Sequence, residues 1–446
     1  MTTDFLTLYN SEEADEIVSE DAFTPILKPF AGELLSLCHY VLEEDDGDGF
    51  TCLNMGILAN VIRHASDVEH LMDRYRARNN RRYVYFRELA ATAKNFGKAA
   101  FLLEELKKSA DLHRFFLDGD SEFVESVESV DRLFAEVLYR NFLELQKEGR
   151  MLELEVPKGR PPVGYGVKLP NRIFLPHTIE ESDSLDRMVT IKKFTQRHEE
   201  FSEEALRTLG GIIQHKEHLA AGIPEKVNEG TLRRLGTRLH NFLSWYDSHI
   251  AQSRIESEIL ELKRLRDIFP AQLNLFKIAT ILAHYYERHL LFPSSLIVDR
   301  LRTIVPSSQL IETGLYFCLY YIVELFHLGH ALADSILDRL VDTVTYELPV
   351  PKTLGFHARP CTRVAKVVQH YGAHVKMLVD DQVFDAGSVI ELLSAGGYIL
   401  TKRLDRVQFR GDRHALDDLK ILAEHNYGET FNGKDIVLPD ALSYLG

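Results

Sequence analysis

The chain has few cysteines and no excess of basic residues. Four of its 446 residues are cysteine (Cys38, Cys52, Cys318 and Cys361), and no two form a CxxC pair. Scattered cysteines favour a reducing cytosol over a disulfide framework. The formal net charge of −15 argues against a general nucleic-acid binder, because phosphate contacts need clustered Lys and Arg.

Long apolar runs are also missing. The first sixteen residues are acidic and contain no basic, apolar stretch of the kind that opens a signal peptide. The most apolar stretch, LYFCLYYIV from Leu315 to Val323, stops at Glu324 and is shorter than a membrane span. We therefore expect a soluble cytoplasmic protein with no membrane partner.

What the chain does contain is helical periodicity over most of its length. Apolar residues recur at helical spacing before residue 155 and again from about 181 to 340, and five prolines with three glycines interrupt the pattern in between. We expect two helical regions, built as helix bundles. The predicted division is a helical domain at 1–155, a Pro/Gly-rich linker at 156–180, a helical domain at 181–340, an α+β domain at 341–430 and a tail at 431–446.

The pattern changes after residue 340. Residues from 341 onward include 12 basic and 14 acidic residues, a net −2, so the first 340 carry the other −13. Strand-like and helix-like segments then alternate in the order βαββαβα, which predicts a small sheet with helices on one face. In chain order the segments are VTYELPVP, RPCTRVAKVVQHY, HVKMLVDD, VFDA, SVIELLSA, RVQFR and DRHALDDLKILAEH.

Several residues have the character of helix caps in this region. Gly372 follows the first predicted helix, and Gly396 with Gly397 is expected to end the second. Ser388 stands three residues before Glu391, the spacing of a capping box at the start of that second helix. Asp412 is a possible cap for the last helix.

The stretch GFHARP places His357 between a strand and a helix. A neutral imidazole is a good nucleophile near neutral pH, and its phosphorylated form can pass the group onward. The first turn of the following helix offers free N–H groups, Arg359 adds a guanidinium suited to phosphate oxygens, and Pro360 fixes the helix start without wasting an N–H. Gly355 permits a close approach of the loop. Together these residues predict a phosphoryl site at His357.

GFHARP, the βαββαβα order and DAGSVIELLSAGG resemble HPr, the histidine-containing phosphocarrier of the bacterial phosphotransferase system. The resemblance covers residues 341 to 426, about a fifth of the chain, and implies an open-faced α+β sandwich there. By this resemblance His357 is the phosphoacceptor, Arg359 attends the phosphate with Pro360 beside it, and Ser388 is the regulatory serine.

The resemblance also implies partners. Val389 and Ile390 match apolar positions at which the family docks other proteins, and packing in the domain core explains these two residues equally well. Phosphate would come from phosphoenolpyruvate through the general phosphotransferase enzyme and leave to a downstream protein, with no cofactor and no metal at His357. Gly387 replaces the family's usual basic residue before Ser388, and capping explains that serine equally well.

Three functions stay open at this point. The first is a phosphocarrier or phosphorylation-dependent regulator that accepts phosphate at His357 and is not a stand-alone enzyme. The second is a helical adaptor whose HPr-like domain serves only for docking. The third is an enzyme in the helical part that the C-terminal domain switches.

Weaker patterns occur in the helical regions. Glu324 and His327 have the ExxH spacing of a di-iron bundle, but no second ExxH accompanies them. His198 and Glu199 have the order found at kinase phosphoacceptor helices, without a nucleotide-binding glycine pattern. We expect a run of aromatic residues to pack a core between helices: Tyr316, Phe317, Tyr320 and Tyr321.

Overall fold

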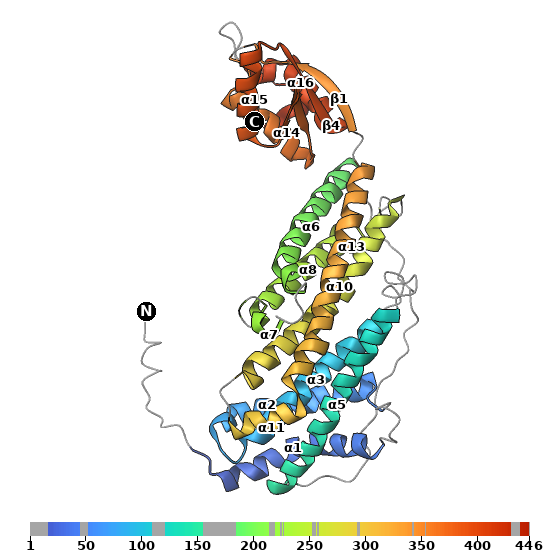
Figure 1. The fold of residues 1–446 in the computed structure, drawn as a ribbon, viewed down its shortest axis with the longest axis vertical. Helices are drawn as coiled ribbons and strands as arrows, with labels where there is room; N and C mark the ends of the chain where they lie inside the picture. Colours follow the sequence, from blue (N-terminus) through green and yellow to red (C-terminus); the bar gives the residue numbers. More distant parts are fainter. Residues whose placement is uncertain are drawn as a thin grey trace, which may run out of the picture. The chain divides into compact units, whose positions relative to one another are not determined.

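The protein is described here from a computed structural model (Figure 1). It is mostly helical, with one four-stranded antiparallel sheet near the C-terminus, as the sequence predicts. The described residues are 17–44, 52–108, 121–154, 184–213, 219–223, 225, 227–251, 256, 258–291, 295–340, 343–352, 354–429 and 438–445. The predicted linker at 156–180 lies outside them.

Two compact units interleave along the chain, whereas the division predicted from the sequence is serial. The first contains residues 1–173, 209–237 and 271–322, and the second contains residues 174–208, 238–270 and 323–446. Four helices contribute residues to both units: α6 (Ser184–Ile213), α8 (Glu229–His249), α10 (Leu260–Tyr285) and α13 (Tyr316–Leu340).

Long amphipathic helices make up the first unit. Each buries one apolar stripe, and α3 is buried on most of its surface, from Tyr85 to Leu106. Ring pairs such as Phe96 with Tyr285, at 5.1 Å between centroids, fill its core. Its remaining helices are α1 (Glu20–Glu43), α2 (Met55–Arg74), η1 (Ala77–Asn79), α3 (Val84–Lys108), α5 (Ser121–Met151), α7 (Leu219–Gly222), η3 (Tyr286–Leu290), α11 (Leu296–Ile304), α12 (Ser307–Gln309) and η4 (Leu310–Leu315).

One helical stretch, Ser307–Leu337, is long and apolar enough to cross a membrane by length and composition. It joins α12, the π-helix η4 and α13 into one rod. Of its most apolar window, 56% is buried inside the structure, and a core helix of a soluble protein passes the same test. The sequence prediction considered only Leu315 to Val323 and missed the length of this helix.

The second unit ends in an α+β domain with the predicted order of elements. The sheet has the strand order β1-β4-β2-β3, and every neighbouring pair is antiparallel. Figure 1 shows its strands and helices in orange and red. The elements are β1 (Thr343–Pro349), α14 (Ala358–Tyr371), β2 (Lys376–Val379), β3 (Gln382–Asp385), α15 (Val389–Lys402), β4 (Arg406–Asp412), α16 (Arg413–Glu424), η5 (Asn426–Gly428) and η6 (Asp440–Leu445).

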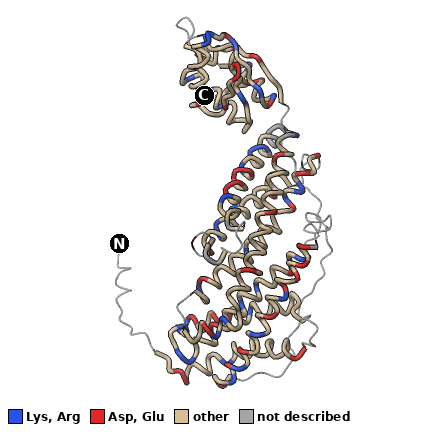
Figure 2. Tube along the Cα trace, viewed as in Figure 1, with Lys and Arg blue, Asp and Glu red and all other residues tan. Residues whose placement is uncertain are grey.

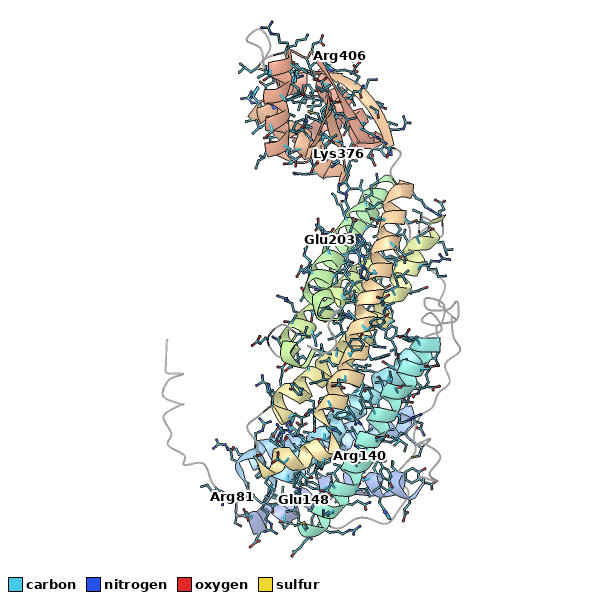
Figure 3. The ribbon with its side chains drawn as sticks, in the orientation of Figure 1. Arg81, Arg140, Glu148, Glu203, Lys376 and Arg406 are labelled. Atoms are coloured by element: carbon cyan, nitrogen blue, oxygen red, sulfur yellow. The ribbon has the colours of Figure 1, made fainter. Side chains whose placement is uncertain are left out.

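One face of this sheet is buried. Val407 and Phe409 of β4 and Met377 of β2 join a core with residues of α14, α15 and α16, while Arg406 and Lys376 on the alternate positions are exposed (Figure 3). Charges of both signs are spread over this domain and over the helical part (Figure 2). The sheet therefore has one packed face and one hydrophilic face.

The predicted caps have different outcomes. Gly372 ends α14 in the left-handed conformation, and Asp412 caps α16 through the N–H groups of His414 and Ala415, both as predicted. The predicted end of α15 at Gly396 and Gly397 is wrong. The helix continues to Lys402 and ends at Arg403, which has a φ of 54°.

Candidate functional site

His357 is the N-cap residue of α14, so its side chain stands at the start of that helix. Its backbone is extended, its N–H donates to the carbonyl of Gly355 (3.0 Å), and its side chain makes no cap hydrogen bond. Leu354 and Gly355, at φ 60° and 61°, make the turn that brings the chain to this position. The imidazole is 33% exposed, which leaves it accessible to another protein.

A close backbone contact fixes the loop that carries His357. Gly396 lies inside α15, and a Cβ added there would be 2.2 Å from the carbonyl oxygen of Phe356. Phe356 itself is buried against Phe409 and Tyr427. Gly396 is therefore needed for close packing, which explains why a glycine stands in the middle of α15 instead of at its end.

The carboxylate of Glu429 pairs with His357. Glu429 follows η5, where Asn426, Tyr427 and Gly428 all have positive φ, and it is only 6% exposed. Its Oε2 lies 3.2 Å from Nε2 of His357. A neutral imidazole that donates from Nε2 carries its lone pair on Nδ1, and Nδ1 has no hydrogen-bond partner among the described residues.

Arg359 lies on the other side of the same carboxylate. Its Nε is 3.8 Å from Oε1 of Glu429, and the guanidinium is 58% exposed. Oε1 accepts no hydrogen bond in the described part of the chain. Arg359 is thus held loosely, close to the imidazole and free to turn toward an incoming anion.

The first turn of α14 keeps two backbone donors. The N–H of Cys361 donates to the carbonyl of His357 (3.1 Å), and Pro360 has no N–H. The N–H groups of Ala358 and Arg359 are left, because the first N–H groups of a helix have no partner inside it. They make the helix start a favourable place for negative charge.

Ser388 caps α15 as predicted, but the capping box is only half formed. Its Oγ accepts the N–H of Glu391 at 3.4 Å, whereas the Glu391 carboxylate accepts the N–H of Asp385 at 2.6 Å. Ser388 therefore has a structural role that requires no modification.

Val389 and Ile390 have different environments. Val389 is half-buried and packs against the domain core, while Ile390 is 77% exposed. Leu393 and Leu400 are also exposed, and together with Ile390 they follow helical spacing along α15. We call these three residues the α15 stripe. A Cβ on Gly355, two residues before His357, would lie 3.7 Å from Leu400, so the stripe ends beside the His357 loop.

The helical part contains a second histidine–glutamate pair. Nδ1 of His289 lies 2.5 Å from Oε2 of Glu88, and both side chains are less than 10% exposed. Arg87 donates to Glu88, Glu69 and Asp73 in the same network. Burial raises the pKa of Glu88, but the His289 hydrogen bond and the charge of Arg87 outweigh it and hold the pKa below its usual value.

A third cluster joins α6 and α13. Ligand atoms of Glu199, His330 and Asp334 lie within 4.8 Å of one another, the only such group found among the described residues. Burial and the Asp334 carboxylate raise the pKa of Glu199. His198 is 1% exposed among aromatic rings, so another protein cannot reach it as a phosphoacceptor, and desolvation lowers its pKa to about 3. Glu324 and His327, the ExxH pair in the sequence, are not part of this cluster.

The structure thus brings His357 and Arg359 together, with Pro360 between Arg359 and the rest of α14, and places Ser388, Val389 and Ile390 at the start of α15. Sequence reasoning missed Glu429, 72 positions from its histidine. Its only signal is the neighbouring Gly428, which indicates a turn. No protein-family model, curated protein or solved structure matches the chain.

Proposed function

We propose that the C-terminal domain is an HPr-like phosphocarrier or phosphorylation-dependent regulatory domain that accepts phosphate at His357. The observation that carries this proposal is the pairing of Nε2 with Glu429, which leaves the lone pair on Nδ1 of a partly exposed imidazole at a helix start. The donor would be the general phosphotransferase enzyme of a bacterial, cytoplasmic phosphotransferase system, charged by phosphoenolpyruvate.

In the proposed step, the Nδ1 lone pair attacks phosphorus, a new N–P bond forms, and the bond from phosphorus to the donor breaks. The proton stays on Nε2, where Glu429 stabilises the positive charge of the imidazolium. The N–H groups of Ala358 and Arg359 and the Arg359 guanidinium are the groups available to the phosphoryl oxygens. Transfer to a downstream protein reverses these events and returns the lone pair to Nδ1.

Arg359 and Glu429 then have linked roles. A phosphoryl group brings about two negative charges at neutral pH, which repel the Glu429 carboxylate if it keeps its position. We infer that Arg359 exchanges Glu429 for the phosphoryl group. Phosphorylation would thereby alter the contact between the start of α14 and the segment after η5.

The α15 stripe supports partner docking beside the reactive group. Three exposed leucine or isoleucine side chains on one helix form an apolar strip of the kind that marks protein contacts. The same strip is what favours the second candidate, a domain that only docks and carries no phosphate. Identifying the docked partner would decide whether the helical part acts as a regulator, an adaptor or an enzyme.

Phosphorylation by the general phosphotransferase enzyme tests the proposal. The full chain is incubated with that enzyme and phosphoenolpyruvate, with a known HPr as positive control, and acid-labile phosphate is measured by intact mass. We expect one phosphate on the wild type and on His374→Ala, an exposed histidine of the same domain, and none on His357→Ala. The carrier proposal is contradicted if the wild type takes up no phosphate, or if His357→Ala takes up as much as the wild type. The proposal of a domain that only docks would then remain.

A further inference from the structure

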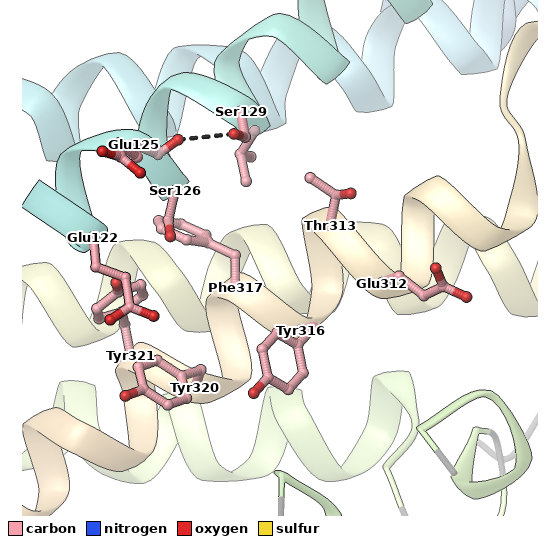
Figure 4. A pocket seen from close by; sticks show the side chains of 11 residues that line it. Glu122, Glu125, Ser126, Ser129, Glu312, Thr313, Tyr316, Phe317, Tyr320 and Tyr321 are labelled. Carbon is pink, nitrogen blue, oxygen red and sulfur yellow. Dashed lines mark hydrogen bonds between the residues drawn. The ribbon is translucent and has the colours of Figure 1, made fainter. Parts of the chain in front are cut away.

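The first unit has a hollow of about 370 Å³ between α5 and the rod formed by η4 and α13. This volume lies in the range of small-molecule sites. Figure 4 shows side chains of α5 on one side and those of η4 and α13 on the other. The residues that line the hollow are Glu122, Glu125, Ser126, Ser129, Val130, Glu312, Thr313, Tyr316, Phe317, Tyr320 and Tyr321.

Aromatic rings form one wall of the hollow. The sequence predicts that these rings pack a core, and this holds for the buried Phe317 and Tyr321, whereas Tyr316 and Tyr320 are half-buried and line the hollow. Tyr316 and Tyr320 stack at 6.0 Å, and Tyr320 meets Tyr321 edge to face at 5.0 Å. Each ring is held by the next, so the wall is pre-formed and presents π faces.

Carboxylates surround this aromatic wall. Glu122 and Glu125 come from α5 and Glu312 from η4, and none of the described residues that line the hollow is a lysine, arginine or histidine. None of the three has an ion-pair partner among the described residues. The helix dipole stabilises Glu122, which lies in the first turn of α5. It does not explain Glu312, which lies inside the rod that begins at Ser307.

The backbone at the hollow is irregular. Glu312 and Thr313 lie in η4, a π-helix that interrupts the rod before α13. A π-turn inserts one residue into the helix and changes the direction of the side chains around it, and such turns are found frequently at functional sites. Glu312 and Tyr316, which are four residues apart, both line the hollow (Figure 4).

We propose that this hollow binds a small organic polycation of the alkylammonium class, such as a polyamine. Ammonium groups are attracted both to aromatic faces and to carboxylates, and the methylene chain between them packs against rings. A hydrated metal ion uses oxygen ligands and gains little from four aromatic side chains. The formal charge of −3 on the described lining residues matches a ligand with two or three ammonium groups.

Calorimetric titration of the full chain with spermidine at about 0.1 M salt, where charges are screened beyond about 10 Å, tests the site. We expect saturable 1:1 binding that is about tenfold weaker in the double variant Glu122→Gln/Glu125→Gln, which loses two charged partners. Tyr320→Leu weakens binding about threefold, while Tyr320→Phe keeps the π face and the affinity. Glu128→Gln, an exposed glutamate of α5 outside the hollow, is the matched control and leaves binding unchanged.

Three results overturn the proposal. The first is no saturable heat with spermidine while circular dichroism shows a folded chain. The second is an equal loss of binding in Glu128→Gln and in the double variant, which indicates a general charge effect. The third is binding of a lysine-rich peptide without binding of spermidine, which assigns the hollow to a protein partner. Phosphorylation at His357 is measured separately, so either proposal can fail alone.

Discussion

The molecule uses the same pair of residue types in two different environments. In the helical part, His289 and Glu88 are 3% and 9% exposed and belong to a network with Arg87. In the C-terminal domain, Glu429 is as deeply buried, but its partner His357 is 33% exposed and keeps one ring nitrogen unbonded. The first pair is closed to other molecules, and the second offers an atom that can react.

The difference shows that a histidine–carboxylate contact can have either a structural or a chemical role. In the buried pair, neither group is hydrated, so each needs the other as its hydrogen-bond partner. The contact therefore specifies how α3 and η3 pack. In the exposed pair, the carboxylate orients the ring and selects its tautomer, so the contact prepares the other nitrogen. Removing the carboxylate should therefore damage stability in one place and chemistry in the other.

The largest expected effect comes from Glu88→Gln. The substitution leaves Arg87 and His289 buried with one charge fewer, and we expect it to lower the free energy of unfolding by about 3 kcal/mol. Glu429→Gln, the same change in the exposed pair, removes one hydrogen-bonding charge and is expected to cost about 1 kcal/mol. Urea denaturation followed by circular dichroism measures both. Equal losses would mean that the two pairs do not differ as argued.

The sign of the pH dependence of Glu88 follows from its lowered pKa. Its contribution to stability is present above the ordinary glutamate pKa, about 4.3, and is lost as pH falls through the lowered value. The stability gap between wild type and Glu88→Gln should therefore be full at pH 7 and shrink in acid.

Gly396→Ala tests the backbone contact that positions His357. The added Cβ meets the Phe356 carbonyl, so we expect a loss of about 2 kcal/mol and slower phosphate uptake at His357. The neighbouring Gly397 has no atom within 4 Å of an added Cβ, and Gly397→Ala should stabilise α15 by about 0.5 kcal/mol. A thermal-melt comparison of the two alanines separates a steric effect from helix propensity. Equal behaviour of both would remove the role given to Gly396.

Ser388→Ala separates capping from regulation. Loss of the Oγ acceptor at the start of α15 should cost about 1 kcal/mol, whereas Ser388→Asp keeps a capping oxygen and should cost little. We expect both variants to accept phosphate at His357 as the wild type does. A strong effect of Ser388→Asp on partner binding, measured by pull-down, would instead support a regulatory serine.

The smallest effect concerns Glu199, whose pKa shift has the opposite sign. A raised pKa means that stability is highest below the ordinary value and is lost as pH rises through the raised one. Glu199→Gln should therefore be more stable than wild type at pH 8, by about 0.5 kcal/mol since the group is partly solvated, and indistinguishable near pH 4. Melting curves with EDTA present measure this, with the exposed Glu200→Gln as control. A gap that is independent of pH would contradict the shared environment with Asp334.

Local patterns predict much of the C-terminal domain. The alternation in β4, the stripe on α14 and the caps at Gly372, Ser388 and Asp412 depend on neighbours a few residues away, and the sequence contains those neighbours. The predicted end of α15 failed because Gly396 serves a contact with Phe356, 40 positions earlier. A glycine needed for close packing looks the same in sequence as one needed for a turn.

Several of the features that sequence reasoning missed are long-range. Glu429 meets His357 only because the left-handed turn at Asn426 to Gly428 brings the chain back across the start of α14. The network around Arg87 looks like an ordinary charged helix face in the sequence, because burial depends on the helices that cover it.

The position of Glu429 has a consequence in terms of thermodynamic reciprocity. If Arg359 exchanges Glu429 for a phosphoryl group on His357, then anything that holds Arg359 on Glu429 must disfavour that phosphoryl group by the same free energy. A partner that bound the exposed Arg359 guanidinium, or that competed for the Glu429 carboxylate, would then set the phosphorylation potential of His357 without touching the imidazole.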